Sequence, residues 1–372
     1  SDLWWNDSKL FGLMQSPSYE KEVAEYMIDA IDAYGINEKW IQNWSSYFAS
    51  IDPAVNPNIF DVVIKNPDDL ALFVAEMKAK DGVEIFPVYI PKRYAVPNDP
   101  QSNVWHLKWW NGVNAYEARD QLSWTTLSSV QVGIVDDGFY VSHEDLSIAS
   151  AVPAWAWGGH GTHVAWLVGA LTNNGKWVPS AARNTWNIQI KWYNYRFWDW
   201  DNDGSSNIMW LVQQAVQEGA KVINMSWWWG WYNSAEAQIF KSAYDQWVVL
   251  IAASGNEYAS QPWYPARYPG VISVWASDSG WNKAGFSNAG ADIMSPWVSI
   301  ISTCIGWWYC DHSGTSMASP LAASVASLLL SINPWLTPDQ IENILKTTKN
   351  AKWVINACNA VASVLQNWYK CT

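Results

Sequence analysis

A serine-containing segment near the C-terminus holds the most reactive combination of residues in the chain. Ser313-Gly-Thr-Ser-Met-Ala-Ser-Pro320 comes directly before an apolar run. One of its serines is therefore expected to open a buried helix, whose N-terminus favours developing negative charge. A serine hydroxyl is a poor nucleophile at neutral pH and needs a base. His160-Gly-Thr-His163 offers an imidazole, and Asp136-Asp-Gly138 offers a carboxylate after the apolar run Val132 to Val135. Asp, His, Ser is one of three chain orders known for a Ser-His-Asp triad.

The aspartate and histidine motifs have the surroundings that a triad needs. Asp136 closes a run that reads as a buried strand, where a carboxylate is costly unless another group uses it. It would orient the imidazole of His160 and stabilise the imidazolium. His160 comes before Gly161-Thr162 and an apolar helix expected from Val164. His163, one turn further along, is expected to be an internal structural histidine.

A fourth segment, Ala252-Ala-Ser-Gly-Asn256, lies between Val222-Ile-Asn-Met-Ser226 and the serine motif. By itself Ser-Gly-Asn predicts only a turn, but its place in this series is specific. The motifs together resemble the subtilisin-like serine proteases (subtilases), and the resemblance covers nearly all of residues 101–372. Among the serines of the motif, the resemblance assigns the role of nucleophile to Ser316.

The resemblance also implies the roles of the residues around Ser316. His160 is the general base, and Asp136 orients its imidazole. The side-chain amide of Asn256 forms an oxyanion hole with the backbone N–H of Ser316. Asp137 stands where many relatives carry Ser or Thr, which is a mild departure from the pattern. We therefore expect the hydrolysis of peptide bonds.

Two segments are implied as walls of the substrate cleft. Ser226-Trp227-Trp228 would form an exposed edge that pairs with an extended substrate and adds a strand through backbone hydrogen bonds. Ala253-Ser254-Gly255 would form the other wall of the primary specificity pocket. The expected partners are protein or peptide substrates, of which the enzyme reads several residues of an unfolded or loop segment.

Structural Ca²⁺ is the expected cofactor, at two sites. In the first, Asp145 and Asn174 match family positions that bind Ca²⁺, and loop carbonyls complete the oxygen set. The ligands expected there are Asp145, Leu171, Asn174, Lys176 and Val178. The second site, at Asp199, Asp201 and Asp203, copies the first half of an EF-hand loop, but Trp210 replaces the bidentate Glu at the twelfth position. A solvated acidic loop is the alternative there. Zinc spacing of His and Cys is absent.

Composition limits the other partners. The 372 residues carry a net charge of -12, and the pI is about 4.8, so the chain has no general basic surface for nucleic acid or anionic lipid. The apolar run from about Pro320 to Ile332 is interrupted by serines and is shorter than the ~20 residues that span a bilayer, so we expect a buried helix. A monomer without nucleic-acid or membrane partners is expected.

Four cysteines permit three pairings. We favour Cys304–Cys310 and Cys358–Cys371 because both close local loops, each of which adds about 2–3 kcal/mol by limiting the unfolded chain. Four free thiols in a cytosolic protein are the alternative. Together with the family resemblance, the disulfides favour a secreted protein.

Residues 1–96 are expected to form a small α+β domain of their own. Apolar residues at spacings of three and four predict a first helix between Ser16-Pro17 and Gly35. The other expected elements are strands over 59–64 and 83–88 and a helix from 66 to 82. A small domain directly before a subtilase domain resembles the family's pro-region, which assists folding and then inhibits. An accessory domain without an inhibitory role is the alternative.

In residues 101–372, short β-rich runs alternate with helical stretches. The expected strands cover 130–135, 186–191, 222–225, 248–253 and 271–276, and the expected helices cover 208–218 and 234–246. This alternation predicts an α/β fold, a doubly wound parallel sheet with helices on both faces, as in subtilisin-like proteases. Catalytic groups are then expected at the carboxyl ends of the strands.

Tryptophan is unusually frequent, with 31 residues against 21 glycines. Trp166, Trp228, Trp263, Trp275 and Trp297 stand where the resembled family carries glycine, although an indole suits neither a positive φ nor a close backbone approach. Overpacking one core site costs about 1–3 kcal/mol, against a total stability of about 5–15 kcal/mol. We hypothesise that some of these letters do not describe the encoded protein, and an intact mass matching 31 tryptophans would refute this. A tryptophan-rich subtilase with a rebuilt cleft is the alternative.

Two other functions compete with the protease. A catalytically silent or self-inhibited binding protein of the same fold would have its cleft filled by Trp228 and Trp263, or held shut by residues 1–96. An esterase or lipase predicts a Gly-x-Ser-x-Gly elbow and the order Ser, Asp, His. Thr315 and Met317 flank Ser316, which comes last in the chain, so the esterase prediction fails.

Overall fold

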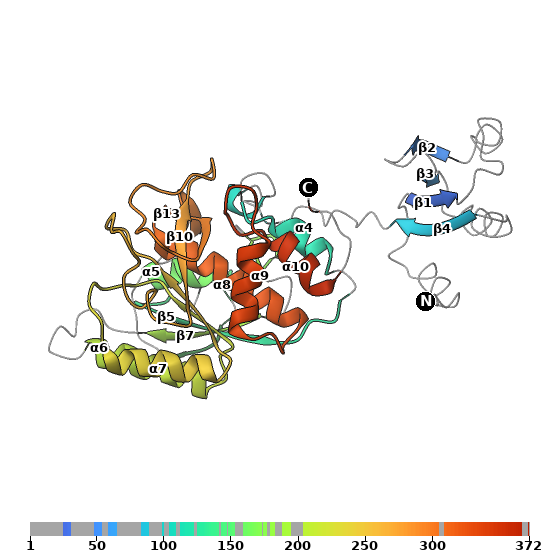
Figure 1. Cartoon of the computed structure of the whole chain (residues 1–372). Helices are drawn as coiled ribbons and strands as arrows, with labels where there is room; N and C mark the ends of the chain where they lie inside the picture. The colour runs from blue at the N-terminus through green and yellow to red at the C-terminus, as the bar shows by residue number, and fades with distance from the viewer. Residues whose placement is uncertain are drawn as a thin grey trace. The chain divides into compact units, whose positions relative to one another are not determined.

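The chain divides into two compact units, Ser1–Pro91 and Lys92–Thr372 (Figure 1). In the first unit the computed structural model describes the backbone of residues 25–30, 48–53, 59–64 and 83–88. In the second unit it describes residues 99, 104–108, 112–122, 125–140, 143–146, 148–152, 159–172, 174–176, 179–182, 188–194, 204–304, 309–366 and 371.

Four antiparallel strands form the described part of the first unit. They are β1 (Glu25–Ala30), β2 (Phe48–Pro53), β3 (Ile59–Ile64) and β4 (Val83–Val88), in the order β2-β3-β1-β4. The expected strands β3 and β4 are confirmed. The helix expected between residues 16 and 35 is wrong at its centre, because β1 lies there and pairs with both β3 and β4. The helix expected over 66–82 lies outside the described residues.

The strand β1 shows why the helix prediction failed. Tyr26, Ile28 and Ala30 alternate with charged or flexible residues, so the same segment also satisfies the period of two that is typical of a strand. Backbone pairing on both edges of β1 then decides between the two patterns, since tertiary context overrides local propensity.

A parallel sheet of seven strands forms the centre of the second unit. Its strands are β5 (Val130–Asp136), β6 (Ile148–Val152), β7 (Ile188–Asn194), β8 (Val222–Met225), β9 (Val249–Ala253), β10 (Val271–Ser277) and β11 (Ile293–Pro296). Their order is β11-β10-β9-β8-β5-β7-β6, and every pair is parallel. All five expected strands are present, and β6 and β11 were not expected.

Helices cover both faces of this sheet, as expected. Along β5, Ile134 packs into one apolar core and Val135 into the other, because successive side chains of a strand point to opposite faces. The first core is shared with α5 (Gly159–Gly169) and α8 (Thr315–Ile332), and the second with α6 (Gly204–Gln217) and α7 (Ser234–Asp245). Figure 1 shows α6 and α7 together beneath the sheet. The fold is therefore the expected doubly wound α/β fold.

The strand order reverses at β5, which lies between β7 and β8. In open parallel sheets such a reversal opens a crevice at the carboxyl ends of the strands, where binding sites form. Asp136 is the last residue of β5. The fold therefore places this carboxylate at the position most typical of a functional site.

Helix α8 is the central helix of the first core. By length and composition it is apolar enough to cross a membrane, but 94% of it is buried inside the protein, as in the core helix of a soluble domain. Its serines bond locally or to neighbours: Ser327 donates to the Ser324 carbonyl oxygen (2.7 Å), and Ser324 donates to that of Val168 (3.0 Å). These bonds allow the polar residues to interrupt the apolar run without a burial penalty.

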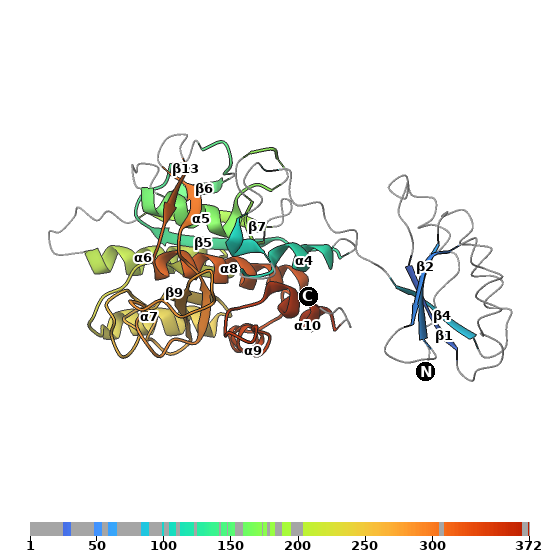
Figure 2. The ribbon, with the colours of Figure 1, turned by 90° about the horizontal axis from the view of Figure 1, so that it is seen from above.

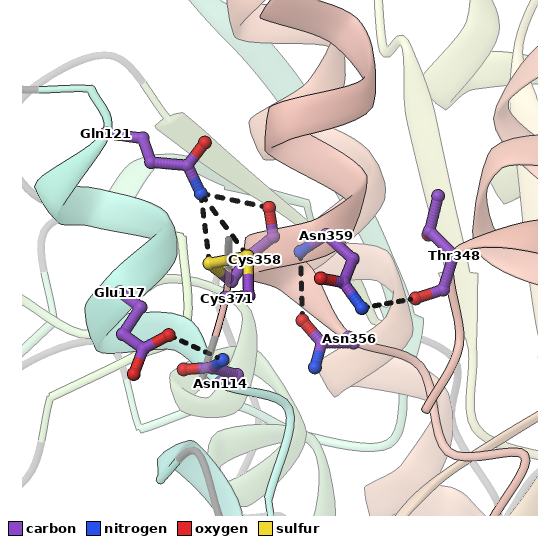
Figure 3. Close-up of a disulfide and its surroundings, with 8 residues drawn as sticks. All are labelled: Asn114, Glu117, Gln121, Thr348, Asn356, Cys358, Asn359 and Cys371. Atoms are coloured by element: carbon purple, nitrogen blue, oxygen red, sulfur yellow. Dashed lines mark hydrogen bonds between the residues drawn. A yellow bond between two sulfur atoms is a disulfide. The ribbon is translucent and has the colours of Figure 1, made fainter. Parts of the chain in front are cut away.

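Helix α10 (Ala357–Leu365) packs against α4 (Ala115–Asp120), and the two lie side by side in both views (Figures 1 and 2). The short helix η3 (Trp105–Leu107) precedes α4, and α9 (Pro338–Thr347) precedes α10. Figure 3 shows the bond between Cys358 of α10 and Cys371. Gln121 donates to the Cys358 carbonyl oxygen at 3.0 Å and links α4 to this disulfide. Asn356 caps α10 by accepting from the Asn359 N–H.

The second disulfide joins Cys304 to Cys310. It crosses a small antiparallel hairpin made of β12 (Ile300–Thr303) and β13 (Tyr309–His312). Both favoured cysteine pairs are therefore present.

Three tryptophans among the described residues have a left-handed backbone. The φ angles of Trp247, Trp281 and Trp353 are 63°, 62° and 72°. Trp247 follows the end of α7, where the Val248 N–H bonds back to the Ala243 carbonyl oxygen at 3.1 Å. Helices that end in this way usually carry glycine at the left-handed position. These sites add to the places where tryptophan occupies a position suited to glycine.

Candidate active site

A buried carboxylate and an imidazole meet at the carboxyl end of β5. Asp136 is fully buried, and its Oδ1 lies 2.7 Å from His160 Nδ1. His160 is the second residue of α5, so this helix begins before the histidine and not at Val164 as expected. With Nδ1 bonded to Asp136, the Nε2 atom is left to act on a substrate or nucleophile. This pairing fixes the tautomer that a general base requires.

The charges around His160 raise the affinity of its imidazole for a proton. Burial acts to lower the pKa of His160, but the charge and hydrogen bond of Asp136 and the charge of Asp137 outweigh it and raise the pKa to about 9. Asp137 Oδ1 lies 4.0 Å from His160 Nδ1. Burial, and then the charge of Asp136, raise the pKa of Asp137 to about 6. The imidazolium is therefore strongly stabilised.

Ser316 occupies the first turn of α8 and is 5% exposed. Its Oγ donates to the Ser226 carbonyl oxygen at 3.1 Å, instead of to His160. In return, Ser226 Oγ donates to the Ser316 carbonyl oxygen at 2.8 Å. That carbonyl is available because Pro320, four residues further along the helix, has no N–H to bond it. The proline thus helps to tie the serine to the end of β8.

The start of α8 also leaves a backbone donor free beside Asn256. Asn256 Oδ1 accepts from the Thr315 N–H (3.1 Å) and from Thr315 Oγ1 (2.9 Å), so its NH₂ group points elsewhere. The N–H groups in the first turn of a helix have no helical acceptor. A Cβ at Gly314, whose φ is 153°, would lie 3.3 Å from Asn256 Nδ2 and 3.9 Å from the Ser316 nitrogen. The missing side chain therefore leaves a small space that two N–H donors border.

Asn288 holds the loop that carries Asn256. It is fully buried, and its Oδ1 accepts from the Glu257 and Ala259 N–H groups, both at 2.9 Å. Its Nδ2 donates to the Ser254 carbonyl oxygen at 3.0 Å. Sequence reasoning missed this residue, because it lies in Ser287-Asn-Ala-Gly290, far from the loop in the chain. An asparagine two residues before a glycine is a weak signal for a turn.

The expected substrate edge follows β8. Trp227 is buried, with its Nε1 donating to the Val135 carbonyl oxygen at 3.0 Å, and Trp228 is partly exposed. Trp229 pairs with Tyr264 through two backbone bonds of 2.7 and 2.9 Å. Ser226 itself is 2% exposed. These bonds fix the backbone of the expected substrate edge.

The expected second wall, Ala253-Ser254-Gly255, lies at the end of β9 and is buried. The Gly255 N–H donates to Thr315 Oγ1 at 3.3 Å, and the Ser254 carbonyl oxygen accepts from the Trp263 N–H at 3.0 Å. Gly255 has a φ of 99°, and a Cβ there would lie 2.3 Å from Asn288 Nδ2. The structure therefore brings both expected walls next to the start of α8.

His163 is internal, as expected. It is fully buried, and its Nε2 lies 3.0 Å from the Ile300 carbonyl oxygen. Burial, and then the neighbouring His312, hold the pKa of His163 well below its usual range. This imidazole is therefore neutral and is not a second base.

Part of the first expected calcium site is described. Asp145 is fully buried, and its oxygens accept from Asn174 Nδ2 (2.7 Å) and Trp166 Nε1 (3.2 Å). The Asn174 N–H donates to Asp99, which is 2% exposed and which sequence reasoning missed. Lys176 is exposed and forms an ion pair with Glu144 (2.8 Å). Leu171 donates its N–H to the Asp145 carbonyl oxygen. Val178 and the second expected site, Asp199, Asp201 and Asp203, lie outside the described residues.

The tryptophans at expected glycine positions differ in burial. Trp166 is fully buried and Trp297 is 6% exposed, whereas Trp228, Trp263 and Trp275 are partly exposed. The buried indoles pack inside the first core.

Comparison with known proteins agrees with this geometry. The model described as "Subtilase family" matches residues 128–363. Subtilisin DY from Bacillus licheniformis is 39% identical over 237 residues, which cover 59% of this chain and 84% of that protein. Subtilisin E from Bacillus subtilis (strain 168) is 36% identical over 241 residues, or 60% of this chain and 61% of that protein.

A match also extends over more of the chain. An alkaline protease from Alkalihalobacillus alcalophilus is 34% identical over 299 residues, which cover 77% of this chain and 75% of that protein. Among solved structures, a protease from Pseudoalteromonas arctica PAMC 21717 has a TM-score of 0.64 and 25% identity, over 73% of this chain and 100% of that chain.

Proposed function

Since this chain belongs to the subtilase family of serine endopeptidases, we propose that it cleaves extended protein segments with Ser316, His160 and Asp136 as its catalytic triad and Asn256 as an oxyanion donor. The observation that carries the proposal is the 2.7 Å bond between Asp136 and His160 at the reversal point of the sheet. The position of Ser316 in the first turn of α8, where its Oγ bonds the Ser226 carbonyl oxygen, supports the role of nucleophile.

In the first step Ser316 Oγ rotates from the Ser226 carbonyl oxygen towards His160 Nε2. The hydroxyl oxygen attacks the carbonyl carbon of the substrate while its proton passes to Nε2. The negative charge that forms on the substrate oxygen is stabilised by Asn256 Nδ2 and by the Ser316 N–H. Asp136 stabilises the imidazolium through Nδ1.

In the second step His160 gives its proton to the leaving amine, and the acyl group remains on Ser316. Water then attacks the ester, His160 accepts the water proton, and the same proton returns to Ser316 Oγ as the acid product leaves. The net reaction consumes one water molecule for each peptide bond cleaved.

Substrate binding is proposed at the Ser226-Trp227-Trp228 edge. An extended peptide would pair with this segment through backbone hydrogen bonds, and Ala253-Ser254-Gly255 would form the opposite wall. Because backbone groups make these contacts, they favour extended chains over folded ones.

A structural Ca²⁺ is proposed at Asp145, Asn174 and the carbonyl of Leu171, with Asp99 as a further ligand. These are carboxylate, amide and carbonyl oxygens, the ligands that Ca²⁺ prefers. Two buried carboxylates in contact with Asn174 make a cation favourable there, so the residues fit the ion. When bound, Ca²⁺ would neutralise this charge and stabilise the loop.

Secretion, and a pro-region role for the first unit, complete the proposal. The two disulfides support an oxidising compartment. If residues 1–96 are a pro-region, the full-length enzyme should cut itself between Ile90 and Asn98, whereas Ser316→Ala should stay intact. Mass spectrometry of both proteins distinguishes a pro-region from an accessory domain.

A fluorophosphonate probe tests the catalytic proposal. Labelling of Ser316 that disappears in Ser316→Ala supports the protease. The hydrogen bond from Ser316 to Ser226 favours one competitor, a silent binding protein of the same fold. The absence of labelling, together with the absence of peptide cleavage, would favour that competitor.

A further inference from the structure

A single side-chain hydrogen bond joins the two segments that flank Ser316. Trp228 Nε1 donates to Glu257 Oε1 at 2.6 Å. Trp228 lies two residues after Ser226, which accepts the Ser316 hydroxyl, and Glu257 directly follows Asn256. The bond therefore joins the expected substrate edge to a residue two positions after the expected second wall, Ala253-Ser254-Gly255.

Glu257 is held in place at its end of this bond. Its Oε2 accepts from Asn288 Nδ2 at 3.1 Å, and its backbone N–H donates to Asn288 Oδ1 at 2.9 Å. Because Asn288 is fully buried, these bonds anchor the exposed Glu257 to the protein interior. Asn288 therefore holds the Glu257 carboxylate where it can accept from Trp228 Nε1.

The residues on both sides of Trp228 fix its backbone. Trp227 is buried and bonds the end of β5, and Trp229 pairs with Tyr264 and donates its indole N–H to Glu236 at 3.2 Å. The rings of Trp227 and Trp229 stack with their centroids 4.8 Å apart. The backbone at Trp228 thus has little freedom to carry its indole away from the cleft.

We propose that the Trp228–Glu257 bond closes the primary side-chain pocket, so that the enzyme selects substrates with a small residue, Gly, Ala or Ser, before the cleaved bond. This inference rests on the proposed function of Ser316, on its two flanking segments and on tryptophan being the encoded residue at position 228. An indole that reaches across between the walls occupies the space that a large substrate side chain needs. Such a side chain must break the bond and displace the ring.

The bond is exposed to solvent, so it restricts large side chains without excluding them. A hydrogen bond to a charged acceptor that is lost on binding lowers the rate for the large substrate by about tenfold or more. Discrimination by pocket size adds a further penalty of about tenfold. Together the two effects predict a preference of about 100-fold for small residues.

The test compares two peptide p-nitroanilides that differ only in the last residue, Ala or Phe. The ratio of kcat/KM for Phe to that for Ala is measured for the full chain and for its variants. Because the ratio is taken within one protein, a general loss of catalysis cancels. Trp228→Gly removes the ring and the bond, and Trp228→Phe removes only the N–H and keeps most of the bulk.

We expect the parent to favour Ala, and Trp228→Gly to raise the Phe/Ala ratio at least tenfold. Glu257→Ala should raise the ratio less than Trp228→Gly does. Glu257→Gln keeps one oxygen for Trp228 but loses the acceptor for Asn288, so it should raise the ratio less than Glu257→Ala does. Trp231→Gly is the matched control, since Trp231 lies three residues away and is 70% exposed, and it should leave the ratio unchanged.

Two results would overturn the inference: a parent that cleaves after Phe as well as after Ala, or a Trp228→Gly ratio within twofold of the parent. Failure of the proposed function gives a different result, in which neither peptide is cleaved and the fluorophosphonate labels none of the proteins. If Trp228→Gly fails to fold, Glu257→Ala and Glu257→Gln still test the inference. A hydrogen bond that sets selectivity requires the Phe/Ala ratio to differ between these two variants.

Discussion

Glu236 is expected to make the protein less stable as the pH rises. It lies in the first turn of α7, is fully buried, and its Oε2 accepts from Tyr268 (2.7 Å) and Trp229 (3.2 Å). Its Oε1 is buried without a hydrogen-bond partner among the described residues. Burial raises the pKa of Glu236 from 4.5 to about 7, although the bonds from Tyr268 and Trp229 oppose the change.

The sign and size of the effect follow from these two pKa values. Because the folded pKa is the higher one, the folded state holds the proton between pH 4.5 and about 7 while the unfolded state releases it. The stabilisation is complete below pH 4.5 and is lost as the pH rises through 7. A tenfold difference in proton affinity is worth about 1.36 kcal/mol, so stability falls by about 2–3 kcal/mol between about pH 5 and pH 8.

Glu236→Gln tests this reasoning, because Gln keeps an oxygen for Tyr268 and Trp229 but cannot ionise. In a Ser316→Ala background, which prevents self-digestion, the variant should match its parent at about pH 5. At about pH 8 its Tm should exceed that of the parent by about 5–10 °C. Thermal unfolding followed by circular dichroism at both pH values measures the difference.

Glu218→Gln is the control. Although burial acts to raise the pKa of Glu218, hydrogen bonds from Gln214, Tyr193 and Lys191 lower it below its usual value, so this variant should gain no stability at alkaline pH. If Glu236→Gln and its parent lose stability in parallel from pH 5 to 8, Glu236 is not the group responsible.

Three further predictions concern the site. Asp137→Asn should lower the pKa of His160, so kcat/KM should rise with pH about half to one pH unit earlier than in the parent. An unchanged pH profile would show that the charge of Asp137 does not raise the pKa of His160. Gly314→Ala should lower kcat by about 10²–10³-fold, because the new Cβ lies 3.3 Å from Asn256 Nδ2 and fills the oxyanion space. It should also lower the Tm, because the φ of 153° strains any side chain at this position. Unchanged turnover would refute that location of the oxyanion space. A chelator should lower the Tm, and added Ca²⁺ should restore it whereas Mg²⁺ should not. In Asp145→Asn the chelator should change the Tm less, and a parent Tm unaffected by chelator argues against bound Ca²⁺.

The sequence signals for Asp136 and His160 are local, and the structure brings these two residues together. Each motif residue follows a strand or opens a helix, and a parallel sheet brings such ends together, so Asp136 and His160 meet although 24 positions separate them. The helix predicted across β1 failed because two neighbouring strands, distant in the chain, decide its conformation.

The hydrogen bonds that hold the loops around the site could not be predicted, because they also join residues far apart in the chain. Asn288 acts on the Asn256 loop from 31 positions beyond Glu257, and the contact between Trp228 and Glu257 spans 29 positions. No periodicity marks either pair. Only the folded chain shows that their side chains meet.

The reciprocal bonds between Ser226 and Ser316 have a consequence for the timing of catalysis. The Ser226 carbonyl oxygen that holds the Ser316 hydroxyl belongs to the edge on which a substrate strand would dock. A substrate N–H aimed at this oxygen competes with the hydroxyl and releases it towards His160. With an empty cleft the Ser316 hydroxyl would therefore stay bonded to Ser226, and a docked substrate strand would free it to bond His160.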